Sequence, residues 1–296
     1  MSKIVHPKIS IVTPSFNQNK YLEKTIQSVV SQAYPNLELV IIDGGSDDGS
    51  VETIRKYEHH LSYWVSEKDE GHGHALNKGF SHTTGDIMAW INSDDMYTPW
   101  SFNVVSEIFT SFPQIMWIVG FNSLWNSGGS MITAKRAPKN IFDYLLGKYA
   151  WIQQESVFWR RDLWEKAGGH INQDYNFMVD GELWTRFFLY ESLYTVDCIL
   201  GGYRLHSDNR AKHNSAECSL EMDKAIAEMR KSCSPDVMKI YNRLEVFPSL
   251  RKHRNLRALV SRLGARLYPS VFRAAAYKNI TWRNEGWIER TLPYSL

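Results

Sequence analysis

The sequence predicts an α/β fold in which helices flank a mainly parallel central sheet. Over the first 120 residues, short apolar runs typical of buried strands alternate with segments of helical spacing. These runs lack the polar alternation of a half-exposed strand, as expected for a sheet covered on both faces. The carboxyl ends of parallel strands meet at one edge of the sheet, where open α/β sheets bind ligands.

Strands and helices are expected to alternate from the first apolar run onward. ISIVTP stops at Pro14, and the helix after it carries apolar residues at helical spacing from Tyr21 to Val30. The expected strands are Ile9–Pro14, Leu37–Asp43, Leu61–Val65, Ile87–Ile91 and Met116–Gly120. The expected helices are Tyr21–Gln32, a segment that begins near Val51, Ala75–Phe80 and Trp100–Phe109.

The second half of the chain is less regular and then becomes helical. Residues 122–140 contain Ser, Gly and Thr in plenty, residues 151–170 are expected to end in a helix that stops at Gly168 and Gly169, and a further helix is expected at Phe177–Leu189. After about Ser215 the strand-like runs stop, and helical patterns cover Leu220–Cys233 and Val237–Leu244. We therefore expect an α/β domain in residues 1–214 and a helical C-terminal region in residues 215–296.

The C-terminal region carries a basic amphipathic pattern. Acidic residues are nearly absent between residues 251 and 284. Such a helix can lie on an anionic membrane surface, or it can pack its apolar stripe on the main domain and leave its Arg side chains in water. The stripe is Leu256, Leu259, Val260, Leu263 and Leu267, with Arg254, Arg257, Arg262, Arg266 and Arg273 around it.

Composition excludes several classes of protein. The net charge of +2 is too small to suggest a nucleic-acid partner. The three cysteines have no CxxC spacing, which argues against a disulfide framework or a zinc site and fits a reducing cytoplasm. No signal peptide and no apolar stretch of ~18 residues are visible. We expect a cytoplasmic protein that could touch the inner face of the cell membrane without crossing it.

Two polar loops follow the first two strands. Neither SFNQN after Pro14 nor DGGSDDGS from Asp43 matches the dinucleotide fingerprint GxGxxG or a P-loop, so neither NAD binding nor a P-loop NTPase is expected. Asp43 could accept a hydrogen bond from a base or a ribose. Alternatively, its carboxylate could bond the backbone of its own turn.

Carboxylates also follow the strand Ile87–Ile91 and begin a later helix. Asp94 and Asp95 lie side by side and suit a hard divalent cation that also binds phosphates, although Asp and Ser are also good turn and cap residues. Asp180 lies near the start of its helix, where the dipole favours a carboxylate, so it could be a cap. His72 and His74 have no metal-ligating neighbour in sequence, and their loop is better explained as ligand-facing than as a zinc site.

Seven segments together resemble family 2 glycosyltransferases, which are inverting, nucleotide-sugar-dependent enzymes with the GT-A fold. In chain order they are ISIVTPSFNQ, VIIDGGSDDGS, SEKDEGHGHALNKGF, MAWINSDD, QESVFWRRDLWEKAGG, DGELWTRF and YRLH, within roughly residues 8–210. The resemblance implies a nucleotide-sugar-binding half in residues 8–120 and an acceptor-binding, catalytic half in residues 121–214. It also implies a Mn²⁺ or Mg²⁺ cofactor.

The same resemblance implies roles for individual residues. Asp180 matches the catalytic base, with Glu182 as second choice, and Trp184 and Arg186 complete that motif. Asp95 would hold the metal with His206. Thr13, Pro14, Ser15, Asp43, Asp69, Asn92 and Asp94 would surround the donor. Lys78 belongs to the ALNKG-like segment, and His74 stands where many members have Asp, so the sugar accepted could differ.

The reaction implied is transfer of a sugar, most simply from a UDP-sugar, to a hydroxyl of a saccharide or lipid-linked saccharide in surface polysaccharide or glycan synthesis. Two alternatives come from other classes. A nucleotidyltransferase would need a basic, Gly-rich loop early in the chain, and SFNQN is neither. A non-catalytic nucleotide-sugar-binding protein would have no use for a base at Asp180.

Overall fold

A nine-stranded sheet forms the centre of the molecule. The structure is a computed structural model that describes residues 6–147, 151–207, 209, 214–246 and 263–294. The strand order is β13-β12-β10-β6-β9-β4-β1-β2-β3. β1 pairs in parallel with β2 and β4, β2 with β3, and β10 with β6 and β12, whereas β9 and β13 run antiparallel to their neighbours. The mainly parallel α/β sheet predicted from the sequence is therefore confirmed.

Five strands of this sheet, β1, β2, β3, β4 and β6, agree closely with the apolar runs found in the sequence, whereas β9, β10, β12 and β13 were not predicted. Six strands lie in the first 160 residues: β1 (Ile9–Ser15), β2 (Leu37–Asp43), β3 (Tyr63–Ser66), β4 (Ile87–Trp90), β6 (Trp117–Val119) and β9 (Val157–Arg160). Three follow: β10 (Tyr194–Val196), β12 (Tyr277–Arg283) and β13 (Gly286–Leu292). All seven residues of β1 are buried, because the strand is covered on both faces.

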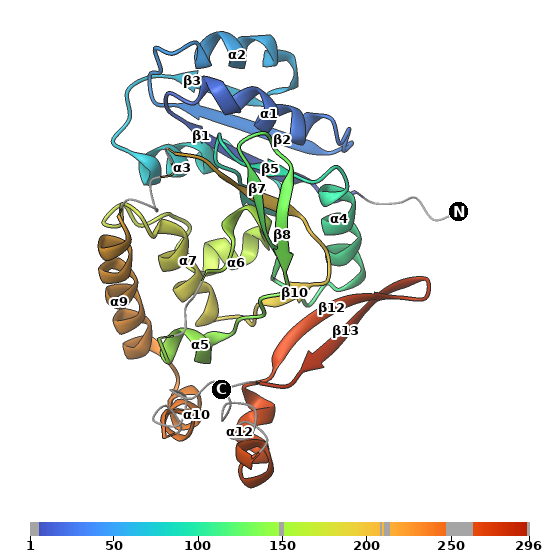
Figure 1. The fold of residues 1–296 in the computed structure, drawn as a ribbon, viewed down its shortest axis with the longest axis vertical. Helices are drawn as coiled ribbons and strands as arrows, with labels where there is room; N and C mark the ends of the chain where they lie inside the picture. The colour runs from blue at the N-terminus through green and yellow to red at the C-terminus, as the bar shows by residue number, and fades with distance from the viewer. Residues whose placement is uncertain (1–5, 148–150, 208, 210–213, 247–262, 295–296) are drawn as a thin grey trace.

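Helices flank the sheet (Figure 1). In the first 190 residues they are α1 (Asn19–Val30), α2 (Ser50–Lys56), α3 (His72–Ser81), α4 (Ser101–Ser111), α5 (Ile141–Leu145), α6 (Arg161–Lys166) and α7 (Val179–Phe188). Single 3₁₀ turns are η1 (Glu58–His60) and η2 (Gln154–Ser156). The later helices are α9 (Ser215–Ser232), α10 (Pro235–Glu245) and α12 (Pro269–Ala274).

A second, four-stranded sheet lies beside the carboxyl end of β4. Its order is β5-β11-β7-β8, from β5 (Met96–Tyr97), β11 (Gly201–Leu205), β7 (Asn122–Asn126) and β8 (Met131–Lys135). β11 passes directly against η2, because a Cβ at Gly201 would lie 2.1 Å from the carbonyl oxygen of Glu155. Only glycine allows this approach, which brings the end of β11 to the polar turn after β4.

Aromatic side chains fill the core between the main sheet and α7. The Trp184 ring stacks on Trp90 (centroids 5.7 Å apart) and on Trp117 (5.7 Å), and all three rings are buried. Aromatic pairs at such distances stabilise a core beyond the area they bury. α7 is therefore fixed rigidly against the sheet, and Trp184 is a core residue.

The C-terminal region is helical at first and ends in strands. α9 packs against α7 (Figure 1). The hairpin β12–β13 extends the main sheet, an addition that the sequence analysis did not predict. Most of the predicted basic stripe lies in residues 247–262, outside the described residues. Within the part of the chain that the structure describes, no helix has the length and apolarity to cross a membrane.

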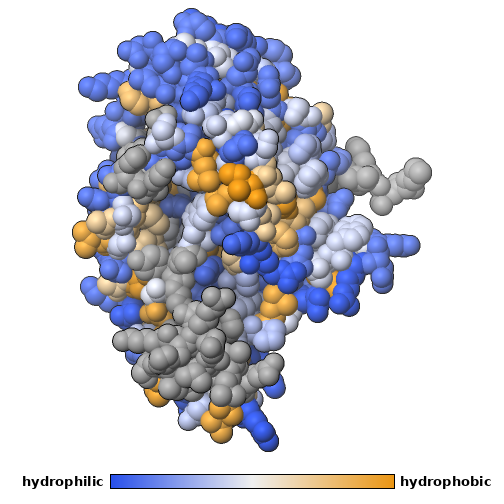
Figure 2. Space-filling model, in the orientation of Figure 1, coloured by the Kyte–Doolittle hydropathy of each residue, from blue (hydrophilic) through white to orange (hydrophobic). Residues whose placement is uncertain are grey.

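The surface is uneven in polarity on the face seen in Figure 2. That face is hydrophilic over α2, and a hydrophobic area lies near its middle, where β7 and β8 run. Met131 and Ile132 on β8 are exposed apolar side chains. The irregular span expected at residues 122–140 thus contains a hairpin with apolar side chains on its outer strand.

Candidate active site

A cavity of about 390 Å³ lies at the carboxyl ends of β1 and β4. Its position is the one expected for a ligand site in an open α/β sheet. The lining residues are Pro14, Ser15, Phe16, Gln18, Asp69, Gly71, His72, Ala75, Asn92, Ser93, Asp94, Asn176, Phe177, Tyr203 and Asn209. Pro14, Ser15, Asp69, Asn92 and Asp94 of the predicted donor site therefore share one cavity.

The turn after β4 presents Asp94 to the cavity. Asp94 Oδ2 lies 3.0 Å from His206 Nε2, although the two residues are 112 positions apart. The His206 ring stacks on Tyr21 at 4.5 Å, and its backbone N–H donates to Asn209 Oδ1 at 2.7 Å. These contacts hold the nearly buried His206 imidazole directly beside the Asp94 carboxylate, which lines the cavity.

Asp95 points away from the cavity. Its side chain is completely buried, and Oδ1 accepts a 2.7 Å hydrogen bond from the backbone N–H of Arg204. In the part of the chain that the structure describes, the other oxygen, Oδ2, has no hydrogen-bond donor. The Thr25 hydroxyl on α1 donates to the carbonyl oxygens of Ser93 and Asp95, which holds the whole turn in place.

Glu155 on η2 lies with Asp95 in a buried acidic pair. Burial raises the pKa of Glu155 to about 7, and the charges of Asp180 and Asp94 add to this effect. Burial and the Glu155 charge likewise raise the pKa of Asp95 well above its usual range. Glu155 was not among the predicted site residues, although it lies in the QESVFW segment that resembles the family.

Arg204 places a positive charge behind this acidic turn. Its side chain is fully buried, its guanidinium nitrogens have no hydrogen-bond partner among the described residues, and its Cζ lies 5.2 Å from the centroid of the Tyr21 ring. Burial lowers the pKa of Arg204, and the Asp95 and Asp94 carboxylates oppose that change. The guanidinium therefore balances part of the negative charge, and the sequence analysis did not identify this role.

The Asp43 carboxylate closes its own loop. Its two oxygens accept hydrogen bonds from the backbone N–H groups of Gly45 and Ser46 and from the hydroxyls of Ser46 and Ser66. This is the turn geometry that the sequence left open as an alternative to base binding. Thr13 is buried in β1. Neither Thr13 nor Asp43 is among the residues that line the cavity.

Asp69 lies next to the Asp43 loop. A Cβ at Gly44 would lie 2.9 Å from Asp69 Oδ2, and Asp69 Oδ1 accepts a 2.8 Å hydrogen bond from the Gly71 N–H. Ser15, at the end of β1, has a buried hydroxyl oxygen that makes no hydrogen bond to any described residue. This corner of the cavity therefore combines a fixed carboxylate with a hydroxyl that a ligand can bond.

Asp180 is the second residue of α7 and follows the cavity wall formed by Asn176 and Phe177. The pKa of Asp180 is raised to about 6: burial is the main cause and the Glu221 charge contributes, while hydrogen bonds from backbone N–H groups oppose the rise. Asp180 also acts electrostatically on Glu155. A carboxylate with a pKa close to neutrality suits proton transfer at physiological pH.

Comparisons with known proteins decide the family. Residues 10–117 match the family model described as glycosyl transferase family 2. This part of the chain is therefore a glycosyltransferase family 2 domain. An uncharacterized glycosyltransferase of Mycobacterium tuberculosis is 29% identical over 200 residues, which cover 66% of this chain and 74% of the relative. The putative teichuronic acid biosynthesis glycosyltransferase TuaG of Bacillus subtilis is 34% identical over 96 residues, 31% of this chain and 37% of the relative.

Solved structures show that this glycosyltransferase has the GT-A fold. Residues 1–349 of TarS from Staphylococcus aureus align with a TM-score of 0.63 at 14% identity, covering 88% of this chain and 75% of that one. The mannosyltransferase PcManGT from Pyrobaculum calidifontis, solved with GDP-Man and Mn²⁺, aligns with a TM-score of 0.54 at 17% identity, covering 90% and 87%. The predicted fold and enzyme class are thus confirmed.

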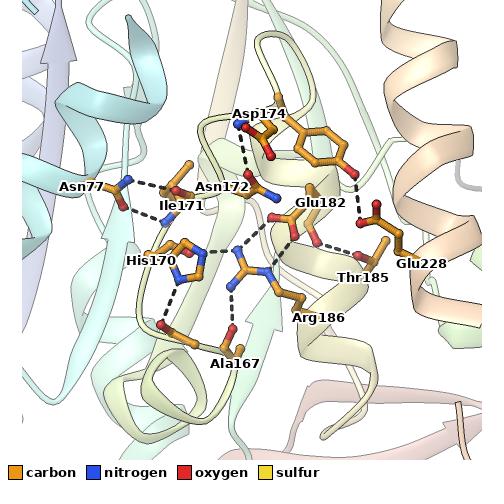
Figure 3. Close-up of polar contacts among 12 residues, drawn as sticks. Asn77, Ala167, His170, Ile171, Asn172, Asp174, Glu182, Thr185, Arg186 and Glu228 are labelled. Atoms are coloured by element: carbon orange, nitrogen blue, oxygen red, sulfur yellow. Dashed lines mark hydrogen bonds and ion pairs between the residues drawn. The ribbon is translucent and has the colours of Figure 1, made fainter. Parts of the chain in front are cut away.

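The remaining predicted site residues of the glycosyltransferase make other contacts. Glu182 accepts two 2.8 Å hydrogen bonds from Arg186, which also donates to the carbonyl oxygens of Ala167 and His170 (Figure 3). Lys78 pairs with Glu67. In the histidine loop, His72 rather than His74 lines the cavity, and its Nε2 lies 3.1 Å from Asn92 Oδ1.

The donor set at the cavity fits a divalent cation that also binds phosphate. Asp94 offers carboxylate oxygen and His206 offers imidazole nitrogen. Among the described residues, no three His, Cys, Asp or Glu side chains form a cluster that could hold a metal. Two protein ligands leave coordination positions for phosphate oxygens and water, as is usual for Mg²⁺ sites that serve nucleotide substrates.

Proposed function

We propose that this glycosyltransferase moves a sugar from a UDP-sugar to a hydroxyl of a saccharide or lipid-linked saccharide, with inversion at the anomeric carbon. The observation that carries the proposal is a single cavity that joins Asp94, the Ser15–Asp69 corner and the wall just before Asp180, with His206 Nε2 3.0 Å from Asp94 Oδ2. TarS, which shares the fold, has been solved with UDP-GlcNAc. That complex supports a UDP-sugar as the first donor to test.

The donor would lie along the carboxyl ends of β1 and β4. Its nucleoside would occupy the corner of Pro14, Ser15 and Asp69, where a hydroxyl and a carboxylate are available for hydrogen bonds. Its diphosphate would then face Asp94. Asp43 would act indirectly, by holding the loop that carries this corner.

A Mn²⁺ or Mg²⁺ ion would be held by Asp94 and His206. This assignment moves the metal contact from Asp95, because the Asp95 carboxylate is buried against Arg204 and does not reach the cavity. When bound, the ion stabilises the negative charge that develops on the leaving nucleoside diphosphate. Asp95 and Glu155 would support the turn from behind.

Asp180 would be the general base that takes the proton of the attacking hydroxyl. Glu182, the second choice, is engaged at both oxygens by Arg186. A single displacement needs one base on the acceptor side and charge stabilisation on the leaving-group side. Asp180 on α7 would supply the base, and the Asp94–His206 pair, from the turn after β4 and the residue after β11, would supply the charge stabilisation through the metal ion.

The acceptor would enter along the half of the domain formed by residues 121–214. Loop residues Asn176 and Phe177 belong to this half and line the cavity. The TuaG relative, named for teichuronic acid biosynthesis, supports a role in surface polysaccharide synthesis. A cytoplasmic enzyme at the membrane face would suit a lipid-linked acceptor, and the Arg-rich sequence of the C-terminal region supports such contact.

Release of nucleoside diphosphate from donor sugars tests this function. We expect slow release of UDP from at least one of UDP-GlcNAc, UDP-glucose and UDP-galactose in the presence of Mn²⁺, with loss of release in EDTA. GDP-mannose serves as the comparison donor. Binding of a UDP-sugar without any turnover would favour a non-catalytic binding protein, and release of pyrophosphate from UTP with a sugar phosphate would favour a nucleotidyltransferase.

A further inference from the structure

Glu221 of α9 holds the chain segment that leads into the base-bearing helix. Its Oε1 accepts a 2.9 Å hydrogen bond from the backbone N–H of Asn176. Its Oε2 accepts from the N–H groups of Phe177 (3.0 Å) and Met178 (2.8 Å). One carboxylate from a helix more than 40 positions later thus binds three consecutive backbone donors.

These donors lie at the start of α7, which begins at Val179. The first N–H groups of a helix have no partner within the helix, and a side chain usually caps them. The residue at the cap position, Met178, makes no side-chain cap hydrogen bond. Glu221 therefore binds the N–H of the N-cap residue and those of the two residues before it, and its negative charge is favoured near the start of the helix by the helix dipole.

The segment that Glu221 binds, residues 176–178, connects the wall of the cavity to the helix that carries Asp180. Asn176 and Phe177 line the cavity, and Asp180 follows Met178 by two residues. Movement of residues 176–178 would therefore displace a wall of the cavity and the carboxylate of Asp180 together. A displacement of about 1 Å at a reacting group can cost about 100-fold in rate.

Other contacts hold the earlier part of the same loop. Asn77 on α3 bonds both the N–H and the carbonyl oxygen of Ile171, and Arg186 on α7 donates to the carbonyl oxygen of His170 (Figure 3). Glu228, also on α9, lies 3.4 Å from the hydroxyl of Tyr175. The loop is thus held from α3 and α7 at its beginning and from α9 at its end.

We propose that Glu221 is a positioning residue for the transfer reaction, which makes α9 part of the catalytic unit. Through three backbone hydrogen bonds it sets the conformation of residues 176–178 and thereby the place of Asp180. The proposal rests on the function proposed above, with Asp180 as base. It also extends the working enzyme beyond residues 10–117, the part that matches the family model.

Variants at position 221 separate the effect of side-chain length on kcat from the effect of side-chain charge. Glu221→Asp keeps the charge but shortens the side chain, whereas Glu221→Gln keeps the length but removes the charge. Both are expected to lower kcat roughly 10- to 100-fold with UDP-GlcNAc, or with the fastest donor of the panel above, because neither can accept all three hydrogen bonds as Glu does. Asp223→Asn, at an exposed site on the same helix, is the matched control and should keep wild-type kcat.

The pH profile gives a readout that a purely structural role would not change. The titratable groups coupled to Asp180 are Glu221 and Cys218 on α9, Tyr144 on α5 and Glu155 on η2. Removing the Glu221 charge in Glu221→Gln should shift the acid limb of kcat to lower pH, while Glu221→Asp should shift it less.

Wild-type kcat and an unshifted acid limb in both variants would overturn the proposal, and so would a lowered Tm with unchanged kcat in the folded protein. Asp180→Asn distinguishes this failure from failure of the proposed function. If Asp180→Asn abolishes transfer while the Glu221 variants behave as wild type, only the positioning role is wrong. If Asp180→Asn remains active, the assignment of the base is wrong as well.

Discussion

Replacing Asp180 with Asn is expected to lower the rate of sugar transfer by about 10²- to 10⁴-fold, because the amide cannot take the proton of the acceptor hydroxyl. Asn has nearly the same size, so α7 should remain folded and the wall formed by Asn176 and Phe177 should stay in place. Donor binding should therefore change little. UDP release and transfer are measured at saturating donor and Mn²⁺, and the dissociation constant of UDP is measured by calorimetry.

Asp174→Asn is the matched control for this variant. Asp174 is exposed on the loop before α7, so the same change of charge there should leave kcat within about twofold of wild type, as is usual for surface substitutions. Activity of Asp180→Asn within tenfold of the wild type would show that another group accepts the proton. Loss of UDP binding together with activity would instead mean that Asp180 belongs to the donor site.

Replacing Asp94 with Asn is expected to remove the metal dependence of nucleotide binding. Asp94 lies 3.0 Å from His206 at the cavity, so loss of its charge leaves a site with one good ligand. Even residues that only orient metal ligands contribute about 10- to 100-fold to metal affinity, so the loss in Mn²⁺-dependent UDP affinity should be at least tenfold. Calorimetric titration of UDP with Mn²⁺ and with EDTA measures it.

Asp95→Asn is the comparison that separates the two adjacent carboxylates. An amide at position 95 can still accept the hydrogen bond from the Arg204 N–H and lies away from the cavity. UDP binding by this variant should keep its dependence on Mn²⁺, as in the wild type. If Asp95→Asn loses the metal effect and Asp94→Asn retains it, Asp95 is the ligand, as the family motif alone suggested.

The alternating strands and helices were predictable because a buried parallel sheet requires continuous apolar runs. Leu37–Asp43 and Ile87–Trp90 have this pattern and form β2 and β4. The hairpin β12–β13 was missed because β13 is largely exposed and both strands contain charged residues, which interrupt an apolar run. Its signal is local: Asn284, with a φ of 52°, and Glu285 form a two-residue loop before Gly286.

The sequence motifs predicted which strand ends carry the polar residues of the site, but not how each side chain is oriented. Polar residues at the ends of β1 and β4 were expected to meet, and the cavity joins Ser15 with Asp94. The motif could not decide which of two adjacent carboxylates faces the cavity, because that depends on β11, where the Arg204 N–H binds Asp95. Glu221 was likewise hidden, since its partners are backbone N–H groups, which no sequence pattern reveals.

The pH dependence of kcat tests most directly whether the Asp180 carboxylate is the base. Because burial raises the pKa of Asp180 to about 6 and only the ionised form accepts a proton, kcat should be constant above pH 7. Below about pH 6 it should fall tenfold per pH unit, as protonation removes the active form. The measurement uses saturating donor and Mn²⁺ at each pH. A kcat that stays constant from pH 7 to pH 5 would contradict the assignment.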